Sequence, residues 1–365
     1  MSTTDPNPDG PTGSPSGAPD AASGSASTAT QTRIQTQPQP KHHSRAYRNG
    51  ELVAENFPLP DLSDWLEHDD ANVWFDLPDP SPQQLQELAA ELGLHALAVE
   101  DVINGRQRPK VDRYDGHQLF NAYAVRVSDG VHLQTVAITA FITKRALITV
   151  HRAGQFDIDD VVARWDNSPD LACHGCGFLI YGLLDYVVDS YFTALQVFDD
   201  EAEELSDQVF DWDGGPAGDE VRRLYDLRRS LLTARRVIGP MREVINSLIH
   251  LRQDLGLSGS ELTPYYQDVY DHAIRAADWT ENLRDLIGTI RETQLTIQGN
   301  RMNLIMKKVT SWAAIIAVPT AVTGFYGQNV PYPGFSSTAG FWTSTGIMIA
   351  LSVTLYVAFR LRDWL

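Results

Sequence analysis

The stretch PYYQDVYDHAIRAADWTENLRDLIGTIRETQLTIQGNRMNLIMKK, residues 264 to 308, has no proline after its first residue and only two glycines, and it runs directly into an apolar segment. Thr263 and Pro264 suit a helix N-cap and first helical position, so the sequence predicts one helix over 264–326. At about 1.5 Å per residue this helix would be roughly 95 Å long. Such a helix needs neighbours along its length, most simply further copies of the same chain.

The apolar segment contains no Asp, Glu, Lys, Arg or His from residue 309 to residue 359. Its parts 309–326 and 341–359 can each nearly span a hydrocarbon core of about 30 Å, so we predict two transmembrane helices. Basic residues flank the two spans: Lys307, Lys308, Arg360 and Arg362. By the positive-inside rule, both chain ends are cytoplasmic in a cell membrane (inner or plasma), and the loop 327–340 faces outside. The alternative is a pair of buried core helices.

Composition excludes several classes of function. The net charge of −18 argues against nucleic-acid binding, which needs a basic footprint. The chain lacks GxxxxGK[ST], HExxH and GxSxG motifs, so neither nucleotide use nor an enzyme is supported. Cys173 and Cys176 are the only cysteines, which excludes a disulfide framework. Their CHGC motif is either half of a zinc or redox site or, in our interpretation, two incidental cysteines on a loop.

The chain before the long helix divides by composition. Residues 1–45 are rich in Ser, Thr, Pro, Gly and Ala and predict a disordered tail. Residues 46–177 mix strand and helix patterns and predict a cytosolic α/β domain. Residues 178–262 predict a helical hairpin that turns at DGGPAG. The expected fold class is an α+β cytosolic domain of the α/β/α type, followed by a stalk helix over 263–308, two transmembrane helices and a basic end at 360–365.

Within the α/β domain, Ser81 and Pro82 suit the N-cap and first position of an amphipathic helix. Four segments have strand character: 72–77, 117–127, 132–143 and 145–151. In the hairpin, ten acidic residues lie between Asp199 and Glu220, and the returning arm is rich in arginine. The two arms either neutralise each other or place an acidic tip against another basic element, such as the lysines beside the membrane.

Seven segments together resemble the CorA-type magnesium and divalent-cation transporters, over about residues 45 to 365. They are VEDVINGRQRPKVD (99–112), ALITVH (146–151), GPMREV (239–244), PYYQDVYDH (264–272), NLIMKKVT (303–310), YGQN (326–329) and the terminal DWL. YGQN stands where that family has Tyr-Gly-Met-Asn, with Gln328 in place of the Met. The resemblance implies a homopentameric funnel in a lipid bilayer, with a central pore lined by the first span.

The resemblance also implies which residues contact ions. Tyr326, Gly327, Gln328 and Asn329 would form a selectivity filter at the outer end of the pore. A neutral ring of amide and carbonyl oxygens can accept hydrogen bonds from the water shell that Mg²⁺ gives up reluctantly. Asn303, Met306, Val309 and Thr310 would form the cytoplasmic mouth and an apolar constriction that excludes water. The alternatives are an interfacial turn at the loop and hydroxyls that bond back to their own helix.

Four cytosolic carboxylates complete the implied machinery. Asp101 and Asp268, with Glu100 and Asp271 nearby, would bind a regulatory cation between neighbouring subunits, although any one of them can also be simple surface charge. The expected function is a channel-like Mg²⁺ transporter driven by the membrane potential and closed by cytosolic Mg²⁺. Transport or efflux of Co²⁺, Ni²⁺ or Zn²⁺, and a non-conducting sensor or scaffold, remain open because Gln328 departs from the family signature.

Overall fold

The computed structural model describes residues 43–105, 107–210, 218–254, 257, 260–328, 331 and 334–365. The last three residues assigned to the tail are described, and strand β1 begins among them at Ser44; residues 1–42 of the predicted tail lie outside the described residues. The strands are β1 (Ser44–Arg48), β2 (Glu51–Glu55), β3 (Ala71–Pro78), β4 (Lys110–Arg113), β5 (Gln118–Ser128), β6 (His132–Ile142) and β7 (Ala146–His151). The shorter helices are η1 (Leu59–Asp61), α1 (Leu62–Leu66), α2 (Pro82–Leu92), α3 (Ala96–Asn104), α4 (Ile158–Asp166), η2 (Pro169–His174) and η3 (Ser260–Leu262). The longer helices are α5 (Cys176–Phe210), α6 (Gly218–Asp254), α7 (Thr263–Tyr326) and α8 (Thr338–Leu361).

The strands form one mixed sheet in the order β2-β1-β3-β7-β6-β5-β4. Only β3 and β7 run parallel among the paired strands described, with Phe75 opposite Ile148. The remaining neighbours are antiparallel. The four predicted strand segments are confirmed as β3, β5, β6 and β7.

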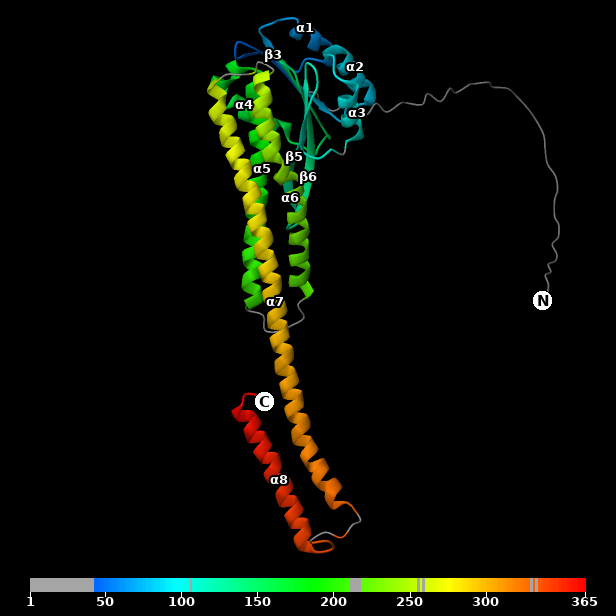
Figure 1. Cartoon of the computed structure of the whole chain (residues 1–365). Helices are drawn as coiled ribbons and strands as arrows, with labels where there is room; N and C mark the ends of the chain where they lie inside the picture. Colours follow the sequence, from blue (N-terminus) through cyan, green and yellow to red (C-terminus); the bar gives the residue numbers. More distant parts are fainter. Residues whose placement is uncertain are drawn as a thin grey trace, which may run out of the picture. The chain divides into compact units, whose positions relative to one another are not determined.

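Alternate side chains of the central strands enter two separate cores, because successive residues of a strand point to opposite faces. Trp74, Phe120 and Leu147 belong to the core shared with α4, α5, α6 and α7. Phe75 and Ile148 belong to the core shared with α1, α2 and α3. Figure 1 shows these helices covering the two faces of the sheet, which is the α/β/α arrangement expected from the sequence.

The caps of α2 agree with the sequence prediction. The Ser81 hydroxyl accepts a hydrogen bond from the Gln84 N–H at 3.2 Å, and the Gln84 side chain accepts one from the Ser81 N–H at 2.9 Å. This reciprocal capping box satisfies two N–H groups that the helix leaves unpaired. Gly93 ends the helix at φ 65°, a left-handed conformation in which glycine is favoured.

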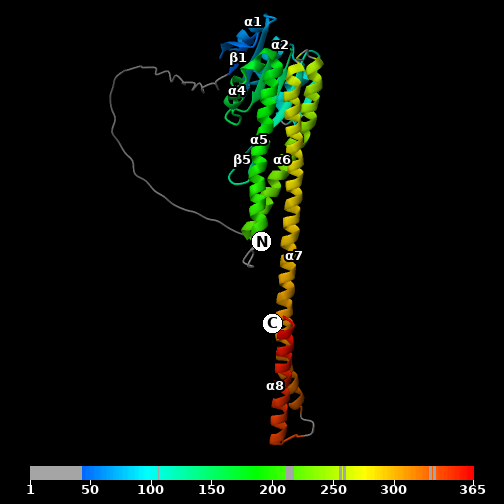
Figure 2. The same cartoon turned by 90° about the vertical axis from the view of Figure 1, so that its left-hand side faces the viewer.

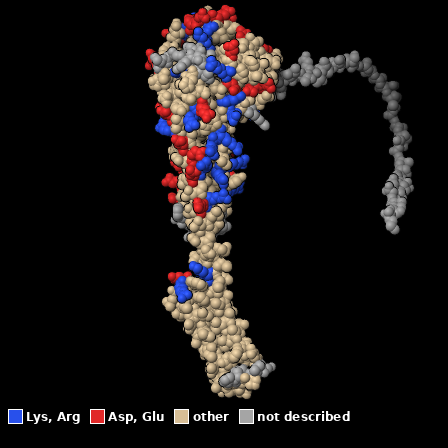
Figure 3. All heavy atoms as spheres, viewed as in Figure 1, with Lys and Arg blue, Asp and Glu red and all other residues tan. Residues whose placement is uncertain are grey.

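Helices α5 and α6 form the predicted hairpin, with oppositely charged faces on its two arms. Arg223 of α6 pairs with Glu201 at 2.7 Å and Glu204 at 3.0 Å on α5. Figure 3 shows acidic atoms along the α5 side and basic atoms along the α6 side. Within the described residues no ion pair joins this hairpin to Lys307 or Lys308, so the neutralising alternative accounts for the contacts seen.

Helix α7 is continuous from Thr263 to Tyr326, as predicted, and only its first half packs in the core. Its buried residues repeat at spacings of three and four: Tyr266, Val269, Ala273, Ala276, Thr280, Leu283, Ile287 and Ile290. The predicted N-cap was wrong, because Leu262 takes that position and makes no side-chain cap bond. The Thr263 hydroxyl instead accepts a hydrogen bond from the Arg252 guanidinium at 3.1 Å.

Three described helices are long and apolar enough to cross a membrane: α5, α7 and α8. The most apolar part of α5 is 61% buried within the protein, compared with 6% for α7 and 0% for α8. The apolar residues of α5 are therefore explained by the core that they share with the sheet. Apart from the side that α7 and α8 turn toward each other, their apolar parts have no cover among the described residues and need lipid or further subunits.

Candidate functional site

The apolar part of α7 has one side that α8 covers. The two helices run antiparallel beside each other in both views (Figures 1 and 2). On α7 the less exposed residues form one stripe, in which Ser311 is fully buried: Ser311, Ala314, Ile315, Val318 and Val322. Partly covered residues of α8 recur with the same spacing: Thr345, Met348, Ser352, Leu355 and Phe359. The periodicity places these two stripes against each other.

The residues predicted to line a pore lie on α7 outside the stripe that faces α8. Asn303, Met306 and Thr310 follow at spacings of three and four, so they lie on one face of the helix. All three are exposed, as is Val309 beside them, with exposed fractions of 59% for Met306 and 60% for Val309. Nothing in the described part of the chain covers this face, which is therefore free to meet other copies of α7.

Most hydroxyls of this span bond to their own helix, as the simpler alternative expected. Ser311 donates to the Lys307 carbonyl at 2.8 Å, and Thr320 donates to the Ile316 carbonyl at 3.1 Å. Thr323 donates to the carbonyl of Pro319. Pro319 itself has no N–H and cannot donate a hydrogen bond within the helix. Among the described hydroxyl residues of the span, Thr310 makes no such bond, and it lies on the exposed face.

Helix α7 ends at the predicted filter. The Gly327 N–H donates to the Thr323 carbonyl at 2.8 Å, and the Gln328 N–H donates to the Phe325 carbonyl at 3.3 Å. These bonds close the last turn and leave the Gln328 side chain exposed. Tyr326 packs edge-on against Phe325, with ring centroids 5.6 Å apart. Asn329, the fourth predicted filter residue, lies outside the described residues.

Asp101 already has a partner in its own chain. Its carboxylate lies 2.9 Å from the Lys110 ammonium, which also pairs with Asp112 at 2.5 Å. Burial tends to lower the pKa of Lys110, but the hydrogen bonds to Asp101 and Asp112 outweigh burial and raise the pKa. Glu100, beside Asp101 in α3, is exposed. A cation bound by Asp101 must therefore compete with Lys110.

The second predicted pair lies on the first turns of α7. Asp268 is 63% exposed and 3.7 Å from His272, while Asp271 accepts a hydrogen bond from Gln267 at 3.2 Å. Figure 1 shows α3 and the first turns of α7 on opposite sides of the sheet, so one chain does not bring Asp101 and Asp268 together. Among the described residues, no group of three or more His, Cys, Asp or Glu side chains is close enough to hold a metal ion.

Sequence reasoning missed two carboxylates near Asp268. Arg164 pairs with Asp185 at 2.5 Å and with Asp189 at 2.8 Å, both on α5. Burial raises the pKa of Asp185, and so does Asp189, while Arg164 and His272 act in the opposite direction. The sequence signal was a pair of acidic residues four apart in the otherwise apolar run FLIYGLLDYVVDSYF.

The CHGC motif lies at a helix start, not on the loop expected from the sequence. Cys173 is exposed in η2 and Cys176 is buried at the first position of α5. Burial raises the pKa of the Cys176 thiol to about 12, which keeps it protonated at neutral pH. The motif forms no part of a metal cluster in the described residues.

Comparison of the sequence with models of protein families matches most of this chain to one family. The family model described as CorA-like Mg²⁺ transporter protein matches residues 69–361, which include strands β3 to β7, the hairpin, α7 and α8. This chain belongs to that family. Its members are transporters, and the two exposed apolar helices agree with a membrane protein.

Individual relatives span most of the chain. A cobalt/magnesium transport protein CorA of Thermotoga maritima is 30% identical over 284 residues, which are 77% of this chain and 80% of that protein. A protein of the same name from Methanocaldococcus jannaschii is 24% identical over 300 residues, covering 80% of this chain and 91% of the relative. The complete structure of the CorA magnesium transporter from Methanocaldococcus jannaschii superposes with a TM-score of 0.69 at 23% identity, over 88% of this chain and 98% of the other. That similarity supports the shared fold of an α/β domain followed by long helices.

Proposed function

We propose that this protein is a homopentameric, channel-like Mg²⁺ transporter driven by the membrane potential and inhibited by cytosolic Mg²⁺. The observation that carries the proposal is the uncovered face of α7 with Asn303, Met306, Val309 and Thr310. A pentamer would turn these faces toward one axis and surround a pathway with alternating polar and apolar rings. Both chain ends would be cytoplasmic, since the basic flanks of the two spans lie on the same side.

Ion selection in this proposal belongs to the end of α7. Gly327, Gln328 and Asn329 supply only neutral oxygens and nitrogens, which suit a hydrated Mg²⁺ that keeps most of its water ligands. No energy source beyond the potential is required, because a divalent ion crossing about 100 mV gains about 4.6 kcal/mol. The cytosolic site would form from Asp101 of one subunit and Asp268 of the next, with Glu100 and Asp271 alongside. A bridging cation would hold adjacent subunits together and keep the pore closed.

Flux through purified protein tests the proposed function. Proteoliposomes with an imposed inside-negative potential should take up Mg²⁺, and Asn329→Ala should reduce the rate by about tenfold because it removes an amide from the proposed filter. Co²⁺, Ni²⁺ and Zn²⁺ are measured in parallel. Uptake of one of these ions without uptake of Mg²⁺ would change the proposed ion and leave the proposed pentameric architecture intact. No uptake of any ion would favour a sensor or scaffold.

The proposed regulatory site predicts a loss of inhibition by internal Mg²⁺. The double variant Asp101→Ala, Asp268→Ala should raise the internal Mg²⁺ concentration for half-inhibition by about fivefold, because binding can no longer favour the closed state. Asp285→Ala is the matched control, since it removes an exposed carboxylate further along α7 that is not a proposed ligand and does not contact Lys110. Unchanged inhibition in the double variant, or an equal shift in the control, would rule out this assignment.

A further inference from the structure

A basic pocket of about 430 Å³ lies between the sheet and α6, separate from the residues proposed for transport. Three arginines line it from different elements: Arg108 before β4, Arg152 after β7 and Arg236 on α6. Gln107, Gln155 and Thr233 add polar groups to the wall. The volume falls in the range of about 300–1,000 Å³ that is usual for sites of small ligands.

The charge of this pocket is uncompensated. Among the described residues no Asp or Glu lines it, although the chain has 47 acidic residues and only 29 basic ones. Elsewhere arginines pair with carboxylates, as Arg45 does with Asp166 at 2.6 Å and Arg164 does with Asp185 at 2.5 Å. In the part of the chain that the structure describes, none of the three pocket arginines makes an ion pair. Like charges gathered in one cavity repel unless an anion lies between them.

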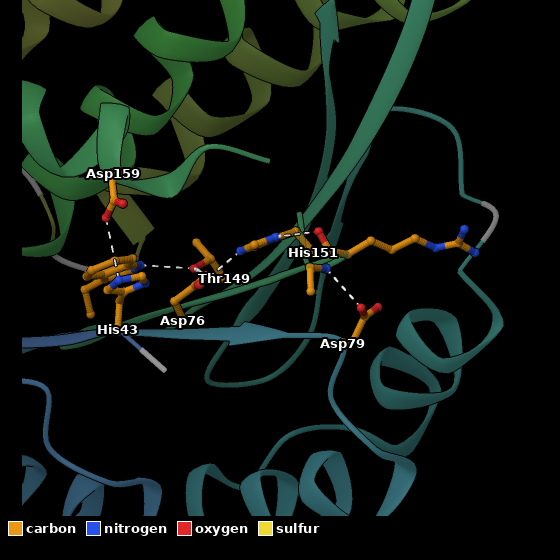
Figure 4. A network of polar contacts seen from close by, with 9 residues as sticks. His43, Asp76, Asp79, Thr149, His151 and Asp159 are labelled. Atoms are coloured by element: carbon orange, nitrogen blue, oxygen red, sulfur yellow. Dashed lines mark hydrogen bonds and ion pairs between the residues drawn. The ribbon is translucent and has the colours of Figure 1, made fainter. Parts of the chain in front are cut away.

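The backbone under Arg152 is held by a buried polar network, which Figure 4 shows. The Arg152 carbonyl accepts a hydrogen bond from His151 Nδ1 at 3.1 Å, and His151 Nε2 lies 2.9 Å from the buried carboxylate of Asp76. The next N–H, of Ala153, donates to Asp79 at 3.0 Å. The end of β7 is therefore fixed from two sides.

The other walls of the pocket are also anchored. The Tyr123 hydroxyl of β5 donates to the Gln107 carbonyl, which ties the loop with Arg108 to the sheet. Arg236 stands next to Val237 on α6, and Val237 is buried in the core. The backbone around the pocket is therefore fixed before binding, and the entropy lost on binding is mainly that of the three exposed arginine side chains.

We propose that this pocket binds a small anion with two or more phosphate groups, either an inorganic polyphosphate or the phosphate chain of a nucleotide. The planar guanidinium group presents paired N–H donors that match phosphate oxygens. The pocket recognises the anion through side chains, which agrees with the absence of a GxxxxGK[ST] loop. Because the lining offers no carboxylate for a divalent cation, the metal-free anion binds more tightly than its Mg²⁺ complex.

Calorimetric titration of the full-length protein in detergent tests this site. The probes are phosphate, pyrophosphate, tripolyphosphate and ATP at constant ionic strength, each with chelator and then with excess Mg²⁺. We expect affinity to rise with the number of phosphate groups and to fall in excess Mg²⁺. Arg236→Gln should weaken tripolyphosphate binding by about tenfold, since one charge-assisted contact is lost. Arg236→Lys keeps the positive charge but lacks the paired N–H donors of a guanidinium group. Its affinity for tripolyphosphate should lie between those of the wild type and Arg236→Gln.

Arg242→Gln is the matched control, because it removes the same charge from an exposed residue of α6 that does not line the pocket. If Arg242→Gln and Arg236→Gln weaken tripolyphosphate binding equally, the effect is due to general surface charge and the proposal is overturned. No binding of any probe, with Arg236→Gln changing the oligomeric state, would instead assign the arginines to carboxylates of a second copy. Tight binding of ATP without tripolyphosphate binding would also contradict a site for the phosphate chain. Binding is measured without ion flux, so either outcome leaves the transport proposal intact.

Discussion

Val309→Asn should make the transporter leak at internal Mg²⁺ concentrations that close the wild type. Val309 is 60% exposed on the uncovered face of α7, next to Met306 at 59%. In the proposed pentamer these side chains meet at the axis and exclude water, so an amide there would allow the closed pore to hydrate. A loss of about 0.5 kcal/mol per copy, repeated around the pentamer, lowers the barrier by about 2.5 kcal/mol, or about a hundredfold in rate.

The matched control for this variant is Val318→Asn, the same substitution further along the same helix. Val318 lies on the partly covered stripe that faces α8, so its amide would not enter the pore. The measurement is Mg²⁺ flux into proteoliposomes loaded with high internal Mg²⁺. A similar leak from both variants would indicate that the membrane helices are loosened in general. If Val309→Asn does not leak, the gate does not lie at this position.

The sequence predicted features that depend on neighbours along the chain. Helix α7 contains no proline between Pro264 and Pro319, and the Ser81 cap depends only on the residues that follow it. The prediction of a cap at Thr263 was wrong because this side chain is engaged by a residue distant in the sequence. Its hydroxyl is used by Arg252, eleven residues away, and no local pattern carries that contact.

The parts that sequence could not predict are pairings over long separations. Strands β3 and β7 lie side by side although about seventy residues separate them, which places Asp76 beside His151. The same strand pairing places Arg152, which follows β7, at the basic pocket. The other two arginines of the pocket come from different elements. Asp185 and Asp189 were missed because their neighbourhood with His272 depends on how α5 packs against α7. Sites assembled from several elements require the fold, whereas a long helix without proline or a cap built from adjacent residues, as at Ser81, does not.

Asp76→Ala should lower the melting temperature of the protein by about 10 °C. The Asp76 carboxylate is 1% exposed and accepts hydrogen bonds from Thr149 at 2.5 Å and from His151 at 2.9 Å. Both nitrogens of His151 face acceptors, the Asp76 carboxylate and the Arg152 carbonyl, so the imidazole is positively charged here. Removing one partner of a buried pair leaves the other charge uncompensated, at a cost of about 3–5 kcal/mol.

Melting is followed by tryptophan fluorescence, since the Trp74 indole N–H donates to Thr149 at 3.1 Å within the same network. Asp159→Ala is the control. It removes an aspartate that lies 3.6 Å from His43 but is 78% exposed, so the change should be below about 1 kcal/mol. Equal melting temperatures for wild type and Asp76→Ala would show that the buried pair contributes nothing to stability.

The same pair gives a pH signature with a defined sign. Burial tends to lower the pKa of His151, but the hydrogen bond and charge of Asp76 outweigh burial, and with Asp79 they raise the pKa above 6.5. The pair therefore contributes fully below about pH 6.5 and loses its contribution as the pH rises through the raised pKa. The difference in stability between wild type and Asp76→Asn should be larger at about pH 6 than at about pH 9. A difference that grows toward alkaline pH would mean that His151 is neutral in the folded protein and that Asp76 stabilises the sheet through Thr149 alone.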